Sequence, residues 1–177
     1  MGNDFFQYGP AAPSPSPVPA PAQAPAAAKP AAPREAAPAD GGRAILGELS
    51  DEDWEKFIGF TARRRYPAGA VIFEIGRVAG ALGFVASGAV EVAAEATPGA
   101  PARPDLREEG DVFGILGFLD GAAATMRVRA RGSTEVLLLT REALLQLAAW
   151  QPRIAVALLR DLGAAVAARL RRVQGGD

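Results

Sequence analysis

The chain has 177 residues, a formal net charge of −1, and neither cysteine nor histidine. The missing side chains exclude disulfides, thiol nucleophiles, haem attachment and the usual zinc and iron sites, so we predict no cofactor and no metal. The near-neutral charge creates no global field that would recruit nucleic acid or an anionic membrane surface. No stretch approaches the ~20 apolar residues that span a bilayer, and the N-terminus lacks a secretory signal, which predicts a cytoplasmic protein without membrane contact.

Residues 1–43 have the composition of a disordered tail. Ten of the fifteen prolines lie between Pro10 and Pro38, interleaved with alanine, and such a tract cannot offset its own ordering entropy. Three aromatic residues, Phe5, Phe6 and Tyr8, precede the tract. Two interpretations stay open: a cloning remnant or strand that folds back onto the domain, or a peptide whose aromatics dock into a partner's groove.

Residues 44–177 are predicted to form one domain, long enough for one ordinary hydrophobic core. Ser50 is the expected N-cap of a first helix, with Asp53 three residues on. Short strand-like runs separated by glycines follow at 71–73, 82–86, 89–93 and 106–111, and one last strand is expected from 126 to 140. Many short strands with glycine turns indicate a sandwich, barrel or roll.

The C-terminal third changes to a helical period. Thr140 is predicted to cap a helix that extends through Trp150, and Pro152 to open a second helix at its first turn. Apolar residues recur along the second helix at steps of three and four, in a stripe longer than capping a roll should need. Gly163 lies beside this stripe. Because glycine inside an exposed helix costs ~1 kcal/mol relative to alanine, its presence indicates that another backbone approaches the helix closely at this point.

This stripe predicts a homodimer. The alternative is that the stripe packs on its own roll and leaves a monomer. The expected interface residues are Leu159, Leu162, Gly163, Val166 and Leu170.

The segment Gly110-Asp111-Val112-Phe113-Gly114 matches a Gly-Asp-x-Phe-Gly signature, and the glycines and aromatics that precede it fall in a matching order. Over residues 45–173 the chain resembles the cyclic nucleotide-binding domain family. The resemblance implies a mainly β fold with flanking helices, a β-roll (jelly roll) followed by C-terminal helices. In that family the last helix commonly pairs two subunits.

The resemblance also implies a degenerate ligand site. The family's glutamate that accepts the ribose hydroxyl corresponds to Ile115, and its arginine that pairs with the cyclic phosphate corresponds to Ala124. Thr125 keeps a hydroxyl, and backbone amides around Gly114 and Leu116 could still face an anion. Losing one partner of a buried charge pair costs roughly 2–5 kcal/mol, and an unpaired buried hydroxyl about 1–3 kcal/mol more. Cyclic nucleotide binding is therefore not expected, and side chains are expected to fill the pocket.

Two nearby arginines are not expected to replace the missing one, because side chains alternate along a strand. In the family register one face of the strand lines the roll interior and the other meets water. The interior set is Ala124, Met126, Val128 and Ala130. The other set is Thr125, Arg127, Arg129 and Arg131, and its arginines are expected to face water.

Two functions remain open. The first is a non-enzymatic regulatory or scaffold protein, a dimeric protein-interaction module with a tethered docking peptide. The second is a small-molecule sensor that binds a cyclic nucleotide or a related ligand in a rebuilt pocket. Many family members continue into a helix-turn-helix, but this sequence ends four residues after Val173, so no DNA contact is expected. Carboxylates near the pocket mouth are interpreted as solvated rather than catalytic: Glu108, Glu109, Asp111 and Asp120.

Overall fold

The computed structural model describes residues 45–94 and 104–175. The tail of residues 1–43, with Phe5, Phe6 and Tyr8, lies outside the described residues. The elements in chain order are α1 (Asp51–Ile58), β1 (Ala62–Tyr66), β2 (Val71–Phe73), β3 (Ala81–Ser87), β4 (Ala89–Ala94), β5 (Asp105–Glu108), β6 (Val112–Phe113), α2 (Ile115–Asp120), β7 (Met126–Ala130), β8 (Thr134–Thr140), α3 (Arg141–Trp150) and α4 (Pro152–Gln174).

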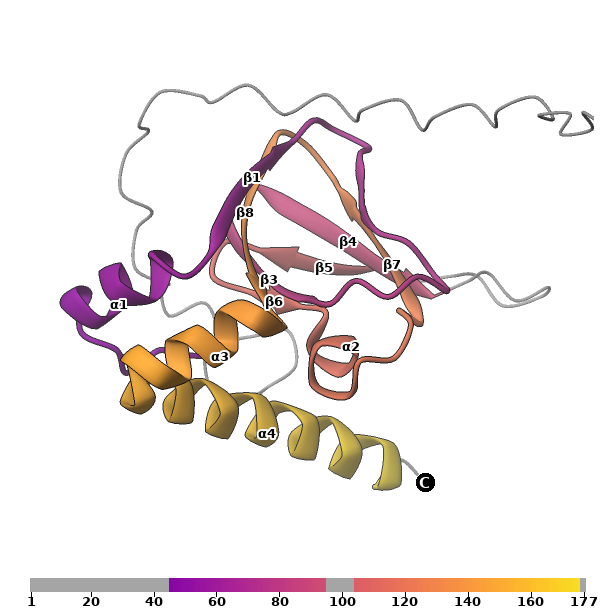
Figure 1. The fold of residues 1–177 in the computed structure, drawn as a ribbon. Helices are drawn as coiled ribbons and strands as arrows, with labels where there is room; N and C mark the ends of the chain where they lie inside the picture. The colour runs from indigo at the N-terminus through magenta and orange to yellow at the C-terminus, as the bar shows by residue number, and fades with distance from the viewer. Residues whose placement is uncertain (1–44, 95–103, 176–177) are drawn as a thin grey trace, which may run out of the picture.

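Eight strands form two four-stranded antiparallel sheets, in the orders β1-β8-β3-β6 and β2-β7-β4-β5. The sheets face each other as a roll, and α4 runs beneath it with its C-terminal end below α2 (Figure 1). The predicted β-roll with C-terminal helices is confirmed. The roll encloses one apolar core: Phe73, Ala81, Val85, Val90, Phe113, Val128 and Val136.

A second core lies between the first sheet and the helices α1, α3 and α4. β8 serves both cores, because Val136 belongs to the roll interior while Leu137 and Leu139 pack against the helices. β3 is buried on both sides for the same reason, over the five residues from Ala81 to Val85. The helical core consists of Ile45, Leu46, Phe57, Leu82, Phe84, Phe118, Leu137, Leu139, Leu147, Ile154, Ala155, Leu158 and Leu162.

The helix starts predicted from the sequence are confirmed. The Ser50 hydroxyl accepts a hydrogen bond from the Asp53 N–H at 3.2 Å, and Thr140 caps α3 in the same way. Pro152 is the first residue of α4, where its missing N–H leaves no helical bond unmade.

Two strand assignments need correction. The expected single strand from 126 to 140 is two strands, because the chain crosses from the second sheet (β7) to the first (β8). Thr134 stabilises the turn between them by donating its hydroxyl hydrogen to the Ala89 carbonyl at 2.9 Å. β1, with three consecutive arginines, was not expected. It pairs with β8, where Glu135 accepts hydrogen bonds from Arg63 at 2.7 Å and from Arg65 at 2.6 Å.

A buried carboxylate attaches the start of the described chain to α4. Asp161, 6% exposed, accepts the Leu46 N–H at 3.0 Å. Leu46 has a φ of 59°, a left-handed conformation that costs a non-glycine residue about 1–2 kcal/mol. Arg160 donates to Asp161 at 3.0 and 3.1 Å, and to Glu48 at 3.3 Å. Residue 46 is thereby held to the helix proposed below to form the dimer.

Candidate functional site

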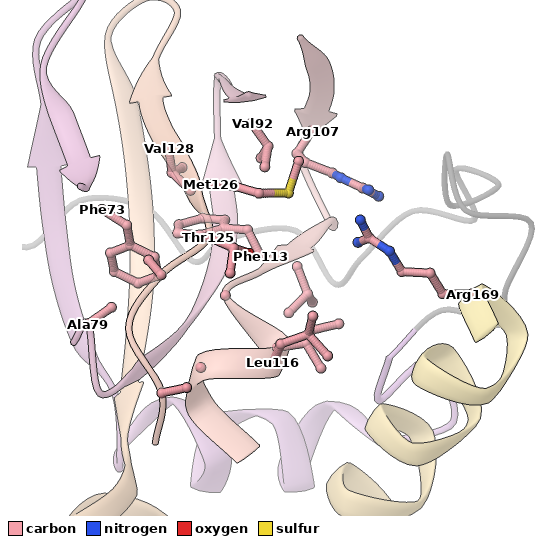
Figure 2. A pocket seen from close by; sticks show the side chains of 16 residues that line it. Phe73, Ala79, Val92, Arg107, Phe113, Leu116, Thr125, Met126, Val128 and Arg169 are labelled. Carbon is pink, nitrogen blue, oxygen red and sulfur yellow. The ribbon is translucent and has the colours of Figure 1, made fainter. Parts of the chain in front are cut away.

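A cavity of about 100 Å³ opens between the second sheet, α2 and the C-terminal end of α4 (Figure 2). Most of its walls are apolar, and no Asp or Glu is among the described residues that line it. Its lining consists of Phe73, Ala79, Val92, Arg107, Val112, Phe113, Gly114, Ile115, Leu116, Gly117, Ala122, Ala124, Thr125, Met126, Val128 and Arg169.

The structure brings the five pocket positions expected from the sequence to this one cavity. Gly114 precedes α2, which starts with Ile115 and Leu116, while Ala124 and Thr125 lie just before β7.

Gly114 has a φ of 82°, and a Cβ on it would lie 2.6 Å from the Phe73 ring. The close approach of β6 to β2 therefore depends on this glycine, and it sets the place where α2 begins.

The expectation that side chains fill the pocket is wrong, because an open cavity remains. Ala124 occupies little of the volume that the family's arginine would take. Leu116, in the first turn of α2, is 48% exposed and so does not seal the mouth.

The alternation expected along the strand after the pocket is confirmed. Val128 and Ala130 are buried, whereas Arg127, Arg129 and Arg131 are exposed. Arg127 donates to Glu74 at 2.6 and 2.8 Å, and these hydrogen bonds hold the pKa of the Glu74 carboxyl below its usual range. The arginines of β7 therefore face solvent and surface carboxylates rather than the cavity.

Two other arginines do reach the cavity, and the sequence analysis did not identify either. Arg107 projects from β5 and is buried at 6% exposure, with Asp105 accepting one of its N–H groups. Arg169 comes from α4, near its C-terminal end. One signal was available for Arg169: it follows the buried Leu158 and Leu162 by eleven and seven residues, on the same helix face.

Of the residues expected at a dimer interface, some are exposed in the structure and others are buried within their own chain. The expectation that Leu162 lies at the interface is corrected, because this side chain is fully buried in the core of its own chain and cannot contact a second subunit. Leu159 and Leu170 are 42% and 54% exposed, and Gly163 is exposed as well. Val166 is half-buried. The solvent-facing stripe is therefore rotated from the expected one.

Within residues 45–94 and 104–175, no helix combines the length and apolar character that a bilayer crossing requires. The same residues contain no group of three or more acidic side chains placed to hold a metal ion.

Comparisons with known proteins agree with this geometry. Residues 63–149 match the family model of the cyclic nucleotide-binding domain. The cyclic AMP receptor protein of Thermus thermophilus is 32% identical over 130 residues, which cover 73% of this chain and 58% of that protein.

Solved structures show the same fold. The Thermus thermophilus catabolite activator protein matches with a TM-score of 0.66 and 31% identity, over 75% of this chain and 60% of that one. The c-di-GMP-responsive global regulator of Xanthomonas campestris matches with a TM-score of 0.56 and 26% identity, over 71% and 63% of the two chains. A cyclic nucleotide-binding domain from Methylobacillus flagellatus, at 22% identity and a TM-score of 0.63 over 72% of each chain, shares the fold.

Residues 63–149 of the chain therefore belong to the cyclic nucleotide-binding domain family. The β-roll and C-terminal helices of the chain are of the kind found in catabolite activator proteins. The chain spans about three fifths of the length of the Thermus relatives.

Proposed function

We propose that this protein is a non-enzymatic regulatory module that works as a homodimer through α4. The observation that carries the proposal is an uninterrupted stripe of residues on the solvent side of that helix, spaced three and four apart. We call it the α4 stripe: Val156, Leu159, Gly163, Val166, Leu170 and Val173.

Exposure and spacing both support pairing of two α4 helices. Val156 and Val173 are 65% and 75% exposed, and an alternating step of three and four is the seam of a left-handed coiled coil. Apart from the two neighbouring residues and the adjacent backbone of α4 itself, no atom of the described residues lies within 4 Å of a Cβ built on Gly163. Nothing in residues 45–94 and 104–175 therefore accounts for this glycine, whereas a second helix approaching closely would.

The dimer is tested by light scattering after size-exclusion chromatography at micromolar concentration. The wild type should have twice the 18.3 kDa chain mass. Leu159→Glu with Leu170→Glu should give a folded monomer, because two charges would be buried in the seam. The matched control is Leu145→Glu with Val78→Glu, two exposed apolar residues outside the stripe, which should remain dimeric. A monomeric wild type at high concentration contradicts the proposal.

A finer part of the proposal is that Phe5, Phe6 and Tyr8 form a docking peptide for a protein partner. Aromatic side chains are strong anchors, and the proline-alanine tract would give them reach. Amide NMR spectra of the full chain test this assignment. Replacing the three aromatics with alanine should leave the signals of residues 45–175 unchanged, since the peptide is not expected to bind its own domain. Shifts within the domain would instead indicate a segment that folds back.

The second candidate function, a sensor with a rebuilt pocket, is favoured by one observation: the cavity is open although the family's two polar anchors are absent at Ile115 and Ala124. The two candidates are compatible, because a ligand in this cavity would touch the helix that carries the α4 stripe.

A further inference from the structure

Two guanidinium groups meet at the mouth of the cavity. Arg107 reaches it from β5 and Arg169 from α4, and their side chains extend toward each other from opposite walls (Figure 2). Neither arginine occupies the position of the family's phosphate-binding arginine, which is Ala124 here. The positive charge of the site therefore comes from β5 and α4 rather than from the position that precedes β7.

The electrostatics at this mouth favour an anion. Within the part of the chain that the structure describes, none of the residues that line the cavity is acidic. Like charges that approach each other in partly desolvated surroundings repel. Asp105 accepts a hydrogen bond from Arg107 at the strand edge. Arg169 has no hydrogen bond or ion pair to the residues that the structure describes. A carboxylate or phosphate oxygen placed between the two side chains would receive charge-assisted hydrogen bonds from both.

The interior behind the arginines suits a small apolar group. Phe73, Val92 and Val128 line it, and Thr125 contributes the hydroxyl side chain of the set. The cavity volume of about 100 Å³ is below the roughly 300 Å³ at which pockets for larger ligands begin. An apolar cavity of about 150 Å³ can hold benzene. The volume therefore fits a short branched chain, or a single ring that extends partly into the open mouth of the cavity.

We propose that the cavity binds a small organic anion, with its apolar body between Phe73, Val92 and Val128 and its acidic group bridging Arg107 and Arg169. This inference rests on the second candidate function, the sensor. It names the ligand class and the two side chains that recognise the charge.

Binding in this mode would act on the dimer helix. Arg169 precedes Leu170 of the α4 stripe, while Arg107 belongs to the second sheet. An anion held by both would fasten the C-terminal half of α4 to the β-roll. Ligand binding should therefore orient the stripe as well as fill the cavity.

Calorimetry and methyl NMR on the full chain test the proposal, with benzoate and phenyl phosphate as probes and benzyl alcohol as the neutral analogue of the same size. The two anions should bind one per chain and shift the Met126 methyl signal, and benzyl alcohol should bind at least tenfold more weakly. Inorganic phosphate, which lacks the apolar body, should also bind more weakly than phenyl phosphate.

Arg169→Gln should weaken benzoate binding at least tenfold, and it should fold normally because Arg169 is exposed. Arg171→Gln is the matched control: it removes the same charge from the exposed last turn of α4 without touching the cavity, and its affinity should stay within twofold. Arg107→Lys adds a second variant, which keeps the charge but loses the planar two-pronged geometry, and binding should again weaken.

Equal binding of benzoate and benzyl alcohol, or unchanged affinity in Arg169→Gln, would overturn the proposal. Tight cyclic AMP binding without benzoate binding would overturn it in favour of a nucleotide sensor. If none of the probes binds, both the proposal and the sensor candidate fail. The dimeric module is judged separately, by light scattering of the ligand-free protein.

Discussion

Asp161 offers a direct test of how the domain is held together. Asp161→Ala removes the acceptor of the Leu46 N–H and leaves that buried donor unsatisfied, at a cost of about 1–3 kcal/mol. The lost contact with Arg160 adds less than about 1 kcal/mol, because the Arg160 side chain is 57% exposed. The left-handed backbone of Leu46 would also lose the bond that helps to offset its conformational cost. We therefore expect a loss of about 2–4 kcal/mol in the free energy of unfolding.

Urea denaturation followed by tryptophan fluorescence measures this loss. Trp54 packs against Phe57 with ring centroids 5.0 Å apart and reports on the helical core. The matched control is Arg160→Gln, which removes only the exposed partner and should cost less than about 1 kcal/mol. Equal costs for the two variants would refute the reasoning, because they would place the stabilisation in the ion pair rather than in the buried Leu46 N–H.

Three further predictions concern the site, the dimer and pH. Calorimetry should detect negligible cyclic AMP or cyclic GMP binding, and Ile115→Glu with Ala124→Arg should increase it; tight binding by the wild type would contradict the proposed loss of the site. Gly163→Ala should raise the helix stability of a monomeric variant by up to ~1 kcal/mol yet weaken the dimer, and a strengthened dimer would argue against close helix approach. Because Arg127 lowers the pKa of Glu74, this pair stabilises the fold above the unfolded-state glutamate pKa, and the contribution is lost as the pH falls through the folded-state value. Glu74→Gln should therefore lower the urea midpoint more at pH 7 than at pH 3, and an equal change at both would contradict the assignment.

Local chemistry explains the parts of the fold that could be predicted. Ser50, Thr140 and Pro152 mark helix starts through interactions within a few residues, so their roles can be read without knowing the rest of the chain. The alternation from Met126 to Arg131 was equally predictable, because the pleat alone decides which side chains share a face.

Partners far along the chain explain the parts that could not. β1 carries three consecutive arginines and no apolar alternation, and it is a strand because β8 supplies hydrogen bonds and Glu135 pairs with two of the arginines. The break between β7 and β8 likewise depends on the two strands joining different sheets, which is a property of the whole roll.

The helix α4 shows the same division. Its sequence determined that it is a helix with apolar residues on more than one side, and that Gly163 lies among them. Only the packing of α1, α3 and the first sheet decided that Leu162 faces inward and Val156 outward, since a difference of one residue rotates the buried face by about 100°.

The sequence by itself determined which polar groups the family's pocket has lost, because Ile115 and Ala124 are local facts that no folding can change. Only the tertiary structure decided that the cavity stays open and that Arg107 and Arg169 flank it. These two arginines are 62 positions apart in the sequence, one on a strand and the other on a helix. The strand and the helix are brought together by the packing of core residues that are not sequence neighbours of either arginine. When packing brings a charged residue to a site in this way, the residues next to it in the sequence do not indicate that it belongs to the site.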